Sequence, residues 1–384
     1  MPFNGERLKQ ARVLRGLTVA ELAERVAQQR QTLSMYEINK SQPSETTIEA
    51  ISKELNFPKR FFYEESIGTQ GTVYFRSLLT TNKRYRSEQI AKMKIIAQIY
   101  HLLQDYIEFP AFDSSDIPSG FSPEEAAGYL RDIWDLGQGP IDNLVTLVEQ
   151  RGILVTTFST STDDIDAFSE PLVVDGSSTF LIAYSNNKTS AARVHFDIAH
   201  ELGHIVMHEW SDDIEELSKE EFKAREQQAN DFAAAFLLPP DAFKKDLLAG
   251  EPYSLAYYKQ LKRKWRVSIA AMIRRARDLN VITTEDYQML LRTMQRRGQR
   301  KEEPLDDVLV TASPALLRTS VIMLLHEGVF TPQEFMEELS SGYSLSIYPE
   351  DVEELLNLPD HTLALQNIIN ISAFLKTKPN PKTQ

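Results

Sequence analysis

The chain has 384 residues, of which 42% are hydrophobic, and a net charge of −13. Its length predicts two or three domains, and its acidity excludes general binding of polyanions, so any nucleic-acid surface must be local. The absence of cysteine excludes disulfides, thiolate zinc sites and cysteine nucleophiles, which leaves metal binding to His, Asp and Glu. No apolar signal core or membrane-spanning run is present, so we expect a cytoplasmic protein without a membrane partner.

Residues 1–66 predict a unit of five short helices. Thr18 and Glu21 have the spacing of a capping box that opens the second helix, and residues 30–37 predict the third. Residues 1–60 contain ten Lys and Arg against seven Asp and Glu. A positive segment in an acidic chain is typical of a local DNA surface.

Two short helices joined by a tight turn in a five-helix unit resemble the helix-turn-helix of XRE-type and lambdoid phage repressors. Leu22-Ala23, Tyr36-Glu37 and Pro43-Ser44 carry the resemblance, which departs at Ala27, where the turn usually has glycine. The resemblance implies a homodimer that binds a double-stranded DNA operator at two half-sites.

Aligned with the family motif, the third helix would present Gln29, Arg30, Gln31 and Ser34 to the major groove. Glutamine can contact adenine, and arginine can contact guanine, through two hydrogen bonds. Lys40 and Arg12 are candidates for phosphate contacts. The alternative is a polar helix face that is simply solvated.

The middle of the chain predicts a linker followed by helices and strands. Residues 67–110 contain a loop with a short strand at 73–75 and a connecting helix that could carry a dimer seam. Further helices begin at Ser122 and Pro140, and three strands follow at 153–158, 167–174 and 179–184. We expect the last strand to be an edge strand that holds an extended peptide by β-augmentation.

A buried helix over residues 193–208 carries His200, Glu201 and His204. Four residues along a helix rise about 6 Å and return to nearly the same face, so the two imidazoles can bind one zinc ion. Glu201 can then accept a proton from water that the metal activates. This H-E-x-x-H pattern is typical of zinc hydrolases.

A second buried helix is predicted over residues 225–240 and supplies the remaining ligand. Glu226 and Asn230 lie four apart on one face, so Glu226 can bind zinc while Asn230 hydrogen-bonds a ligand histidine. The alternative is a buried helix pair in which backbone carbonyls satisfy the two histidines.

Residues 193–208, followed by the stretch from Glu226 to Pro239, resemble the ImmA/IrrE metallopeptidase family, and residues 74–77, 126–134 and 137–141 resemble its XRE-fused subgroup. The resemblance implies a zinc-dependent endopeptidase that cleaves a transcriptional repressor. It assigns His200, His204 and Glu226 as ligands and Glu201 as the general base. His208 would support the site from outside the ligand set, His195 would lie at the surface or behind the ligands, and Tyr184 is a candidate oxyanion stabiliser.

The remaining chain is helical. Residues 253–300 are helical and basic, and the pattern of 257–265 followed by 267–277 is similar to a second helix-turn-helix, although packing on the peptidase core is the favoured interpretation. The basic run at 296–301 is either a solvated loop or a phosphate contact.

We therefore predict a mostly helical α+β fold. It has a helix-turn-helix domain (1–66), a linker and connecting helix (67–110), a zincin-like metallopeptidase domain with a small sheet (111–300), a separate helical module (301–375) and a disordered tail (376–384).

Three functions follow. The first is a DNA-binding regulator whose zinc endopeptidase cleaves a repressor or itself, and so switches phage, mobile-element or stress genes. The second is a transcription factor whose peptidase-like domain senses a ligand or partner without cleavage. The third is an antitoxin-like repressor.

Overall fold

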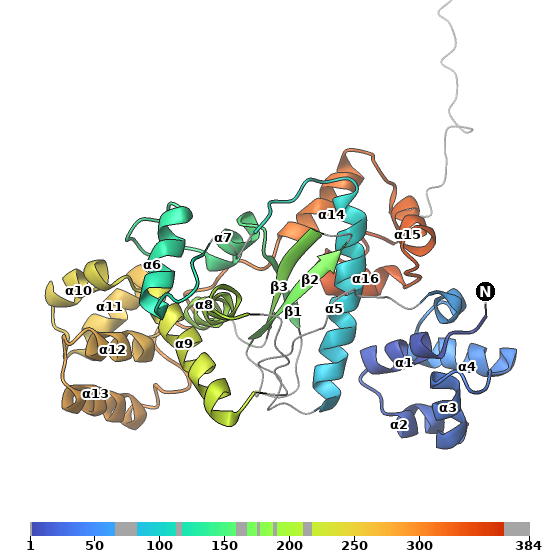
Figure 1. The fold of residues 1–384 in the computed structure, drawn as a ribbon, viewed down its shortest axis with the longest axis horizontal. Coiled ribbons are helices and arrows are strands. Elements are labelled where there is room, and N and C mark those ends of the chain that lie inside the picture. The colour runs from blue at the N-terminus through green and yellow to red at the C-terminus, as the bar shows by residue number, and fades with distance from the viewer. Residues whose placement is uncertain are drawn as a thin grey trace, which may run out of the picture.

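The computed structural model describes residues 2–65, 83–112, 117–158, 167–174, 177–186, 190–209 and 217–364. The predicted mostly helical α+β class is confirmed. A small three-stranded sheet lies near the middle of an elongated molecule, with the N-terminal helices at one end and helices α10 to α13 at the other (Figure 1). No helix among these residues is long and apolar enough to span a membrane.

The N-terminal unit is built from short capped helices. It comprises α1 (Gly5–Leu14), α2 (Val19–Arg25), α3 (Arg30–Glu37), α4 (Glu45–Leu55) and the 3-10 helix η1 (Lys59–Tyr63). The capping box of Thr18 and Glu21 is present, and Ser44 caps α4. The predicted fifth helix is therefore of the 3-10 type.

The turn between α2 and α3 requires a left-handed backbone at Ala27, where φ is 52°. This is the position at which the sequence departs from the usual glycine. A left-handed conformation costs an L-residue roughly 1–2 kcal/mol. The turn is nevertheless closed, because Gln28 donates its backbone N–H to the carbonyl of Ala23 at 2.8 Å.

The connecting helix α5 (Lys83–Gln104) packs inside the chain. Its apolar face is buried, with Met93, Ile96 and Ile99 at most 3% exposed, and the helix contacts α1 and the C-terminal helices. The apolar face that we expected as a dimer seam is thus already covered, because long-range packing within one chain satisfies it.

The C-terminal helices α14 (Leu316–His326), α15 (Pro332–Ser341) and α16 (Pro349–Leu356) share a hydrophobic core with α5 and the N-terminal unit. The expectation of a separate helical module is not met. Residues beyond Leu363, including the predicted last helix and tail, lie outside the described residues except for Ala364, as does the strand predicted at 73–75.

Charged groups fasten the N-terminal unit to the C-terminal helices. Arg15 makes two hydrogen bonds to the carboxylate of Asp351, at 2.7 and 2.8 Å, and its guanidinium lies 4.6 Å from the ring centre of Phe57. Arg7 donates to the carbonyl of Ser344. These contacts join segments more than 300 residues apart in sequence.

The strand order is β1 (Leu154–Phe158), β3 (Ser177–Ser185), β2 (Ala167–Val174). β3 pairs in parallel with β1 and antiparallel with β2, so it is the central strand. The predicted edge position of residues 179–184 is wrong. Their nearly continuous apolar run is buried on both faces, which is the pattern of a central strand.

The two faces of the sheet belong to different cores. Leu181 and Ala183 face α5 and the C-terminal helices, whereas Phe180 and Ile182 face α8 (Ala191–Met207) and α9 (Lys219–Leu237). α6 (Pro123–Ile133) and α7 (Leu144–Gln150) complete this second core. α7 begins later than the predicted Pro140, because Asn143 caps it.

The far end of the molecule consists of α10 (Pro240–Leu248), α11 (Leu255–Trp265), α12 (Ile269–Asp278) and α13 (Thr284–Arg296). The buried ammonium of Lys262 contacts Glu303 at 2.8 Å and Asp306 at 2.6 Å. Asp306 also accepts from the hydroxyl of Ser190, the N-cap of α8. This network ties the far end to the start of α8.

Candidate metal centre

The candidate centre lies where α8 and α9 approach closely. A Cβ atom at Gly203 would lie only 3.0 Å from the Phe232 ring and 3.2 Å from the Cα of Ala229. Glycine therefore permits the contact that brings α9 against the histidine face of α8. The sequence showed this glycine within the motif, but its packing role depends on the neighbouring helix.

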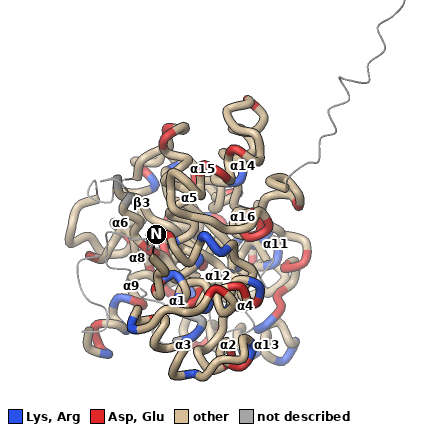
Figure 2. Tube along the Cα trace, turned by 90° about the vertical axis from the view of Figure 1, so that its right-hand side faces the viewer, with Lys and Arg blue, Asp and Glu red and all other residues tan. Residues whose placement is uncertain are grey.

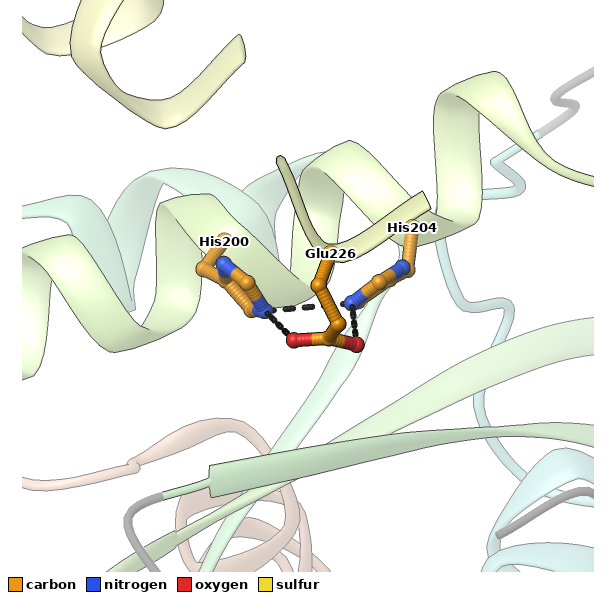
Figure 3. A group of neighbouring side chains, drawn as sticks. All are labelled: His200, His204 and Glu226. Carbon is orange, nitrogen blue, oxygen red and sulfur yellow. Dashed lines mark hydrogen bonds and ion pairs between the residues drawn. The ribbon is translucent and has the colours of Figure 1, made fainter. Parts of the chain in front are cut away.

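Three predicted ligand side chains meet at this contact (Figure 3). The Nε2 atoms of His200 and His204 lie 3.1 Å apart. The Glu226 carboxylate reaches from α9 to both, with Oε2 at 3.3 Å from His200 Nε2 and Oε1 at 3.2 Å from His204 Nε2. The three residues offer ligand atoms that lie within 4.8 Å of one another.

These donors fit a divalent zinc ion. Atoms that bind one tetrahedral zinc at 2.0–2.1 Å lie about 3.3 Å from one another, close to the separations observed here. Two imidazole nitrogens that face each other also need a shared proton or a cation between them. Glu226 is 29% and His200 16% exposed, against 1% for His204, so the cluster is open to solvent on one side.

Electrostatics favours an ionised carboxylate at this position. Burial alone would raise the pKa of Glu226, but hydrogen bonds from His200 and His204 hold that pKa well below its usual range. Burial alone would lower the pKa of His200, but the hydrogen bond to Glu226 and the charge of Glu201 leave it raised. The cluster is therefore a negative ligand facing two bases, which is the charge pattern that a divalent cation requires.

Glu201 follows the first histidine but points toward the sheet. Its side chain is 2% exposed, and the hydroxyl of Ser169 in β2 donates to its Oε2 atom at 2.6 Å. Burial raises the pKa of Glu201 to about 7. Sequence reasoning missed Ser169. The available signal was a small polar residue inside a strand that is otherwise mostly apolar.

His208 supports His204 from behind. Nδ1 of His204 and Nδ1 of His208 lie 3.1 Å apart, and Nε2 of His208 lies 3.0 Å from the amide oxygen of Gln228. Asn230 behaves differently from the expectation. Its amide nitrogen donates to the backbone carbonyl of Glu226 at 2.8 Å rather than to a histidine, because that carbonyl lies one turn back on the same helix.

His195 is not at the surface, as one expectation had it. It is fully buried, its Nε2 accepts from the backbone N–H of Leu144 at 3.3 Å, and it contacts the hydroxyl of Thr311 at 3.2 Å. Burial lowers the pKa of His195 to about 4. Tyr184 is buried too, in the core formed with α6 to α9, and burial and the charge of Glu149 raise its pKa.

The predicted DNA-reading residues form an exposed surface on and beside α3. Gln29, Arg30, Gln31, Ser34 and Lys40 are all exposed. Arg12 is the exception among the proposed contacts. Its guanidinium is buried, with Nε at 2.5 Å and Nη2 at 3.0 Å from the Glu37 carboxylate, and it also donates to the carbonyl of Leu17. Arg12 therefore holds the domain together, and its assignment as a phosphate contact is wrong.

Comparison with known families matches two separate segments of the chain. Residues 8–62 match the helix-turn-helix family model, and residues 148–277, which include both histidines and Glu226, match the Peptidase_M78 model of the IrrE N-terminal-like domain. No curated protein matches the chain. The chain is thus a fusion of an XRE-type helix-turn-helix domain and an IrrE/ImmA-like domain of the M78 peptidase family.

Proposed function

We propose that this regulator cleaves a repressor, or itself, with a zinc-dependent endopeptidase site, and so switches phage, mobile-element or stress genes. The observation that carries the proposal is the convergence of His200, His204 and Glu226 beside Glu201, in a chain that begins with a helix-turn-helix.

The chain's own residues supply ligands and proton transfer. His200, His204 and Glu226 would hold the metal, and His208 fixes the ring of His204 through their contact. When bound, zinc supplies Lewis acidity toward a carbonyl oxygen and makes water more acidic. Glu201 accepts the proton of the attacking water and returns it to the leaving amine.

The substrate would lie along β2. In the described part of the sheet, β2 pairs with β3 alone, and its Ser169 contacts Glu201. Pro171 lacks an N–H and is tolerated at a sheet edge. An extended peptide that pairs with this edge would pass close to the general base.

The DNA-binding part would act through α3. Gln29, Arg30, Gln31 and Ser34 would contact bases in the major groove, and Lys40 a phosphate. Homodimers of this domain type place two such helices on two half-sites of an operator.

A second candidate is a sensor that binds a peptide or ligand without cleavage. It is favoured by the burial of Glu201, which is 2% exposed and held by Ser169, and by the core that α5 shares with the helix-turn-helix unit. Occupation of the site would then be communicated to the DNA-binding unit.

The variant Glu201→Gln separates the two functions. We expect it to keep metal, measured by plasma mass spectrometry, and DNA binding, while cleavage of a co-purified repressor or of the chain itself disappears from intact-mass spectra. Glu220→Gln, an exposed carboxylate on α9, is the matched control. Unchanged gene regulation in cells that carry Glu201→Gln would reject cleavage as the function and leave the sensor.

A further inference from the structure

The C-terminal end of α13 carries a cluster of exposed cations. Arg292, Arg296, Arg297, Arg300 and Lys301 are all exposed, and we call them the α13 basic end. Residues 287–301 contain these five cations and no acid, in a chain whose net charge is −13. The cluster belongs to neither the metal centre nor the helix-turn-helix.

These charges are not neutralised by the protein. Arg292 donates to the amide oxygen of Gln288 at 2.9 Å, and Arg296 donates to the hydroxyl of Thr293 at 3.2 Å, so both partners are neutral. Within the described part of the chain, none of the five cations forms an ion pair.

The neighbouring helix α12 shows the opposite pattern. Arg275 pairs with Glu124 at 2.8 Å, Arg277 with Asp278 at 2.6 Å, and Arg274 with Asp231 at 3.8 Å. The three cations of α12 are therefore paired with acidic groups of the protein. The unpaired cations lie one helix further along the chain.

Stabilisation of the helix terminus does not account for the cluster. A cation in the last turn gains about 0.3–1 kcal/mol from the helix dipole, and the effect fades beyond that turn. Arg300 and Lys301 follow the end of α13 at Arg296, so they gain little from it.

Helix α13 lies on the same side of the molecule as the DNA-reading helix α3. Figure 1 places α3 and α13 at opposite ends of the long axis and both along the lower side. The view turned by 90° in Figure 2 again places both at the bottom. A duplex that follows this side can therefore meet both helices.

We propose that the α13 basic end binds the phosphate backbone of DNA that flanks the half-site contacted by α3. The proposal rests on DNA binding by the helix-turn-helix. Each phosphate contact releases condensed counterions, and arginine suits phosphate because its guanidinium can donate two parallel hydrogen bonds. Without such contacts, flanking DNA would meet an acidic domain and be repelled.

The test compares a charge reversal with a matched control. Arg296→Glu with Arg300→Glu alters the basic end, and Lys244→Glu with Lys245→Glu makes the same charge change at two exposed lysines of α10. Fluorescence anisotropy would measure binding to random-sequence duplexes of about 40 bp and about 12 bp over a range of salt concentrations, because salt dependence counts phosphate contacts.

We expect the basic-end variant to bind the long duplex roughly tenfold more weakly than the wild-type chain, with a salt slope reduced by about 2. Its binding to the short duplex should match that of the wild-type chain, and the α10 variant should match it on both. The neutral pair Arg296→Gln with Arg300→Gln should give a smaller loss in the same direction.

Three results would overturn the proposal: an unchanged affinity for the long duplex, an equal loss in the α10 variant, or an equal loss on the short duplex. Arg30→Glu with Lys40→Glu tests the underlying function separately, because it reverses two exposed charges at the α3 surface and should weaken binding to any sequence. If that variant still binds the short duplex as tightly as the wild-type chain, DNA binding through α3 fails, and the flanking contact fails with it.

Discussion

Breaking the ion pair between Arg15 and Asp351 should loosen the helix-turn-helix unit from the C-terminal helices. Two hydrogen bonds of 2.7 and 2.8 Å join the pair, and the side chains are 25% and 10% exposed. Loss of one partner costs about 3–5 kcal/mol for a buried pair, while an exposed pair contributes about 0–1 kcal/mol. For this partly exposed pair we expect Asp351→Ala to cost about 2 kcal/mol.

One structural detail keeps the cost below the buried limit, because Arg15 retains the carbonyls of Leu55 and Asn56 as acceptors after the carboxylate is removed. A second detail adds to the cost. Asp351 lies in the first turn of α16, so its removal also loses a favourable interaction with the helix dipole of about 0.3–1 kcal/mol. A double-mutant cycle with Arg15→Ala removes the dipole contribution and should leave a coupling energy of about 1–2 kcal/mol.

Amide hydrogen exchange followed by mass spectrometry is the suitable assay, because it reports the opening of α1 and α16 separately from the peptidase core. The control is Glu350→Ala, which removes an exposed acid from the same helical turn. A coupling energy below about 0.5 kcal/mol, or faster exchange confined to α16, would refute the inference that this pair fastens the two units.

Three further predictions concern the site, a turn and the pH dependence of stability. Ser169→Ala should lower kcat roughly tenfold at unchanged metal content, with recovery in Ser169→Thr, because the hydroxyl positions Glu201; equal rates in steady-state peptide cleavage would contradict this. Ala27→Gly should raise the free energy of unfolding by about 0.5–1 kcal/mol. The strain of a left-handed alanine is removed, and this gain exceeds the cost of the greater entropy of the unfolded chain. A lower thermal midpoint would exclude such strain. Burial raises the pKa of Glu149 from 4.5 to about 7. The contribution of its protonated form to the free energy of unfolding is therefore fully present below pH 4.5 and is lost as the pH rises through about 7. Between pH 5 and pH 8, Glu149→Gln should therefore gain up to about 3 kcal/mol relative to the wild-type chain in denaturant titrations, and a constant difference would disprove it.

Features encoded by neighbouring residues were predictable from the sequence. The capping box of Thr18 and Glu21 opens α2, and the interval between His200 and His204 places both rings on one face of α8. Each depends only on helix geometry within one or two turns. The same reasoning placed Glu226 and Asn230 on one face of the next buried helix, and the structure brings the Glu226 carboxylate to the two rings.

Features that depend on distant partners were not predictable in this way. A strand pattern at 179–184 does not reveal which strands flank it, and its central position follows from pairing with both β1 and β2. The residues next to Arg12 and His195 in sequence do not reveal their partners, the Glu37 carboxylate and the N–H of Leu144, which belong to other elements. The contact of Arg15 with Asp351 spans 336 residues and leaves no local trace.

The placement of β2 connects the candidate metal centre to the DNA-binding unit. Ser169 points from β2 to Glu201, while Phe168 and Leu172 on the opposite face pack in the core that α5 shares with α1. Proximity alone does not transmit a signal, because a ligand shifts an equilibrium only by its different affinities for two states.

The two candidate functions make different demands on this connection. A sensor requires that a peptide at the site change the affinity for DNA by some factor, and DNA must then change the affinity for the peptide by the same factor. An endopeptidase that destroys a repressor needs no such coupling, so the peptide can leave the affinity for DNA unchanged. Peptide affinity of the Glu201→Gln chain, measured with and without operator-length DNA, therefore distinguishes a site that reports to α3 from one that only cuts.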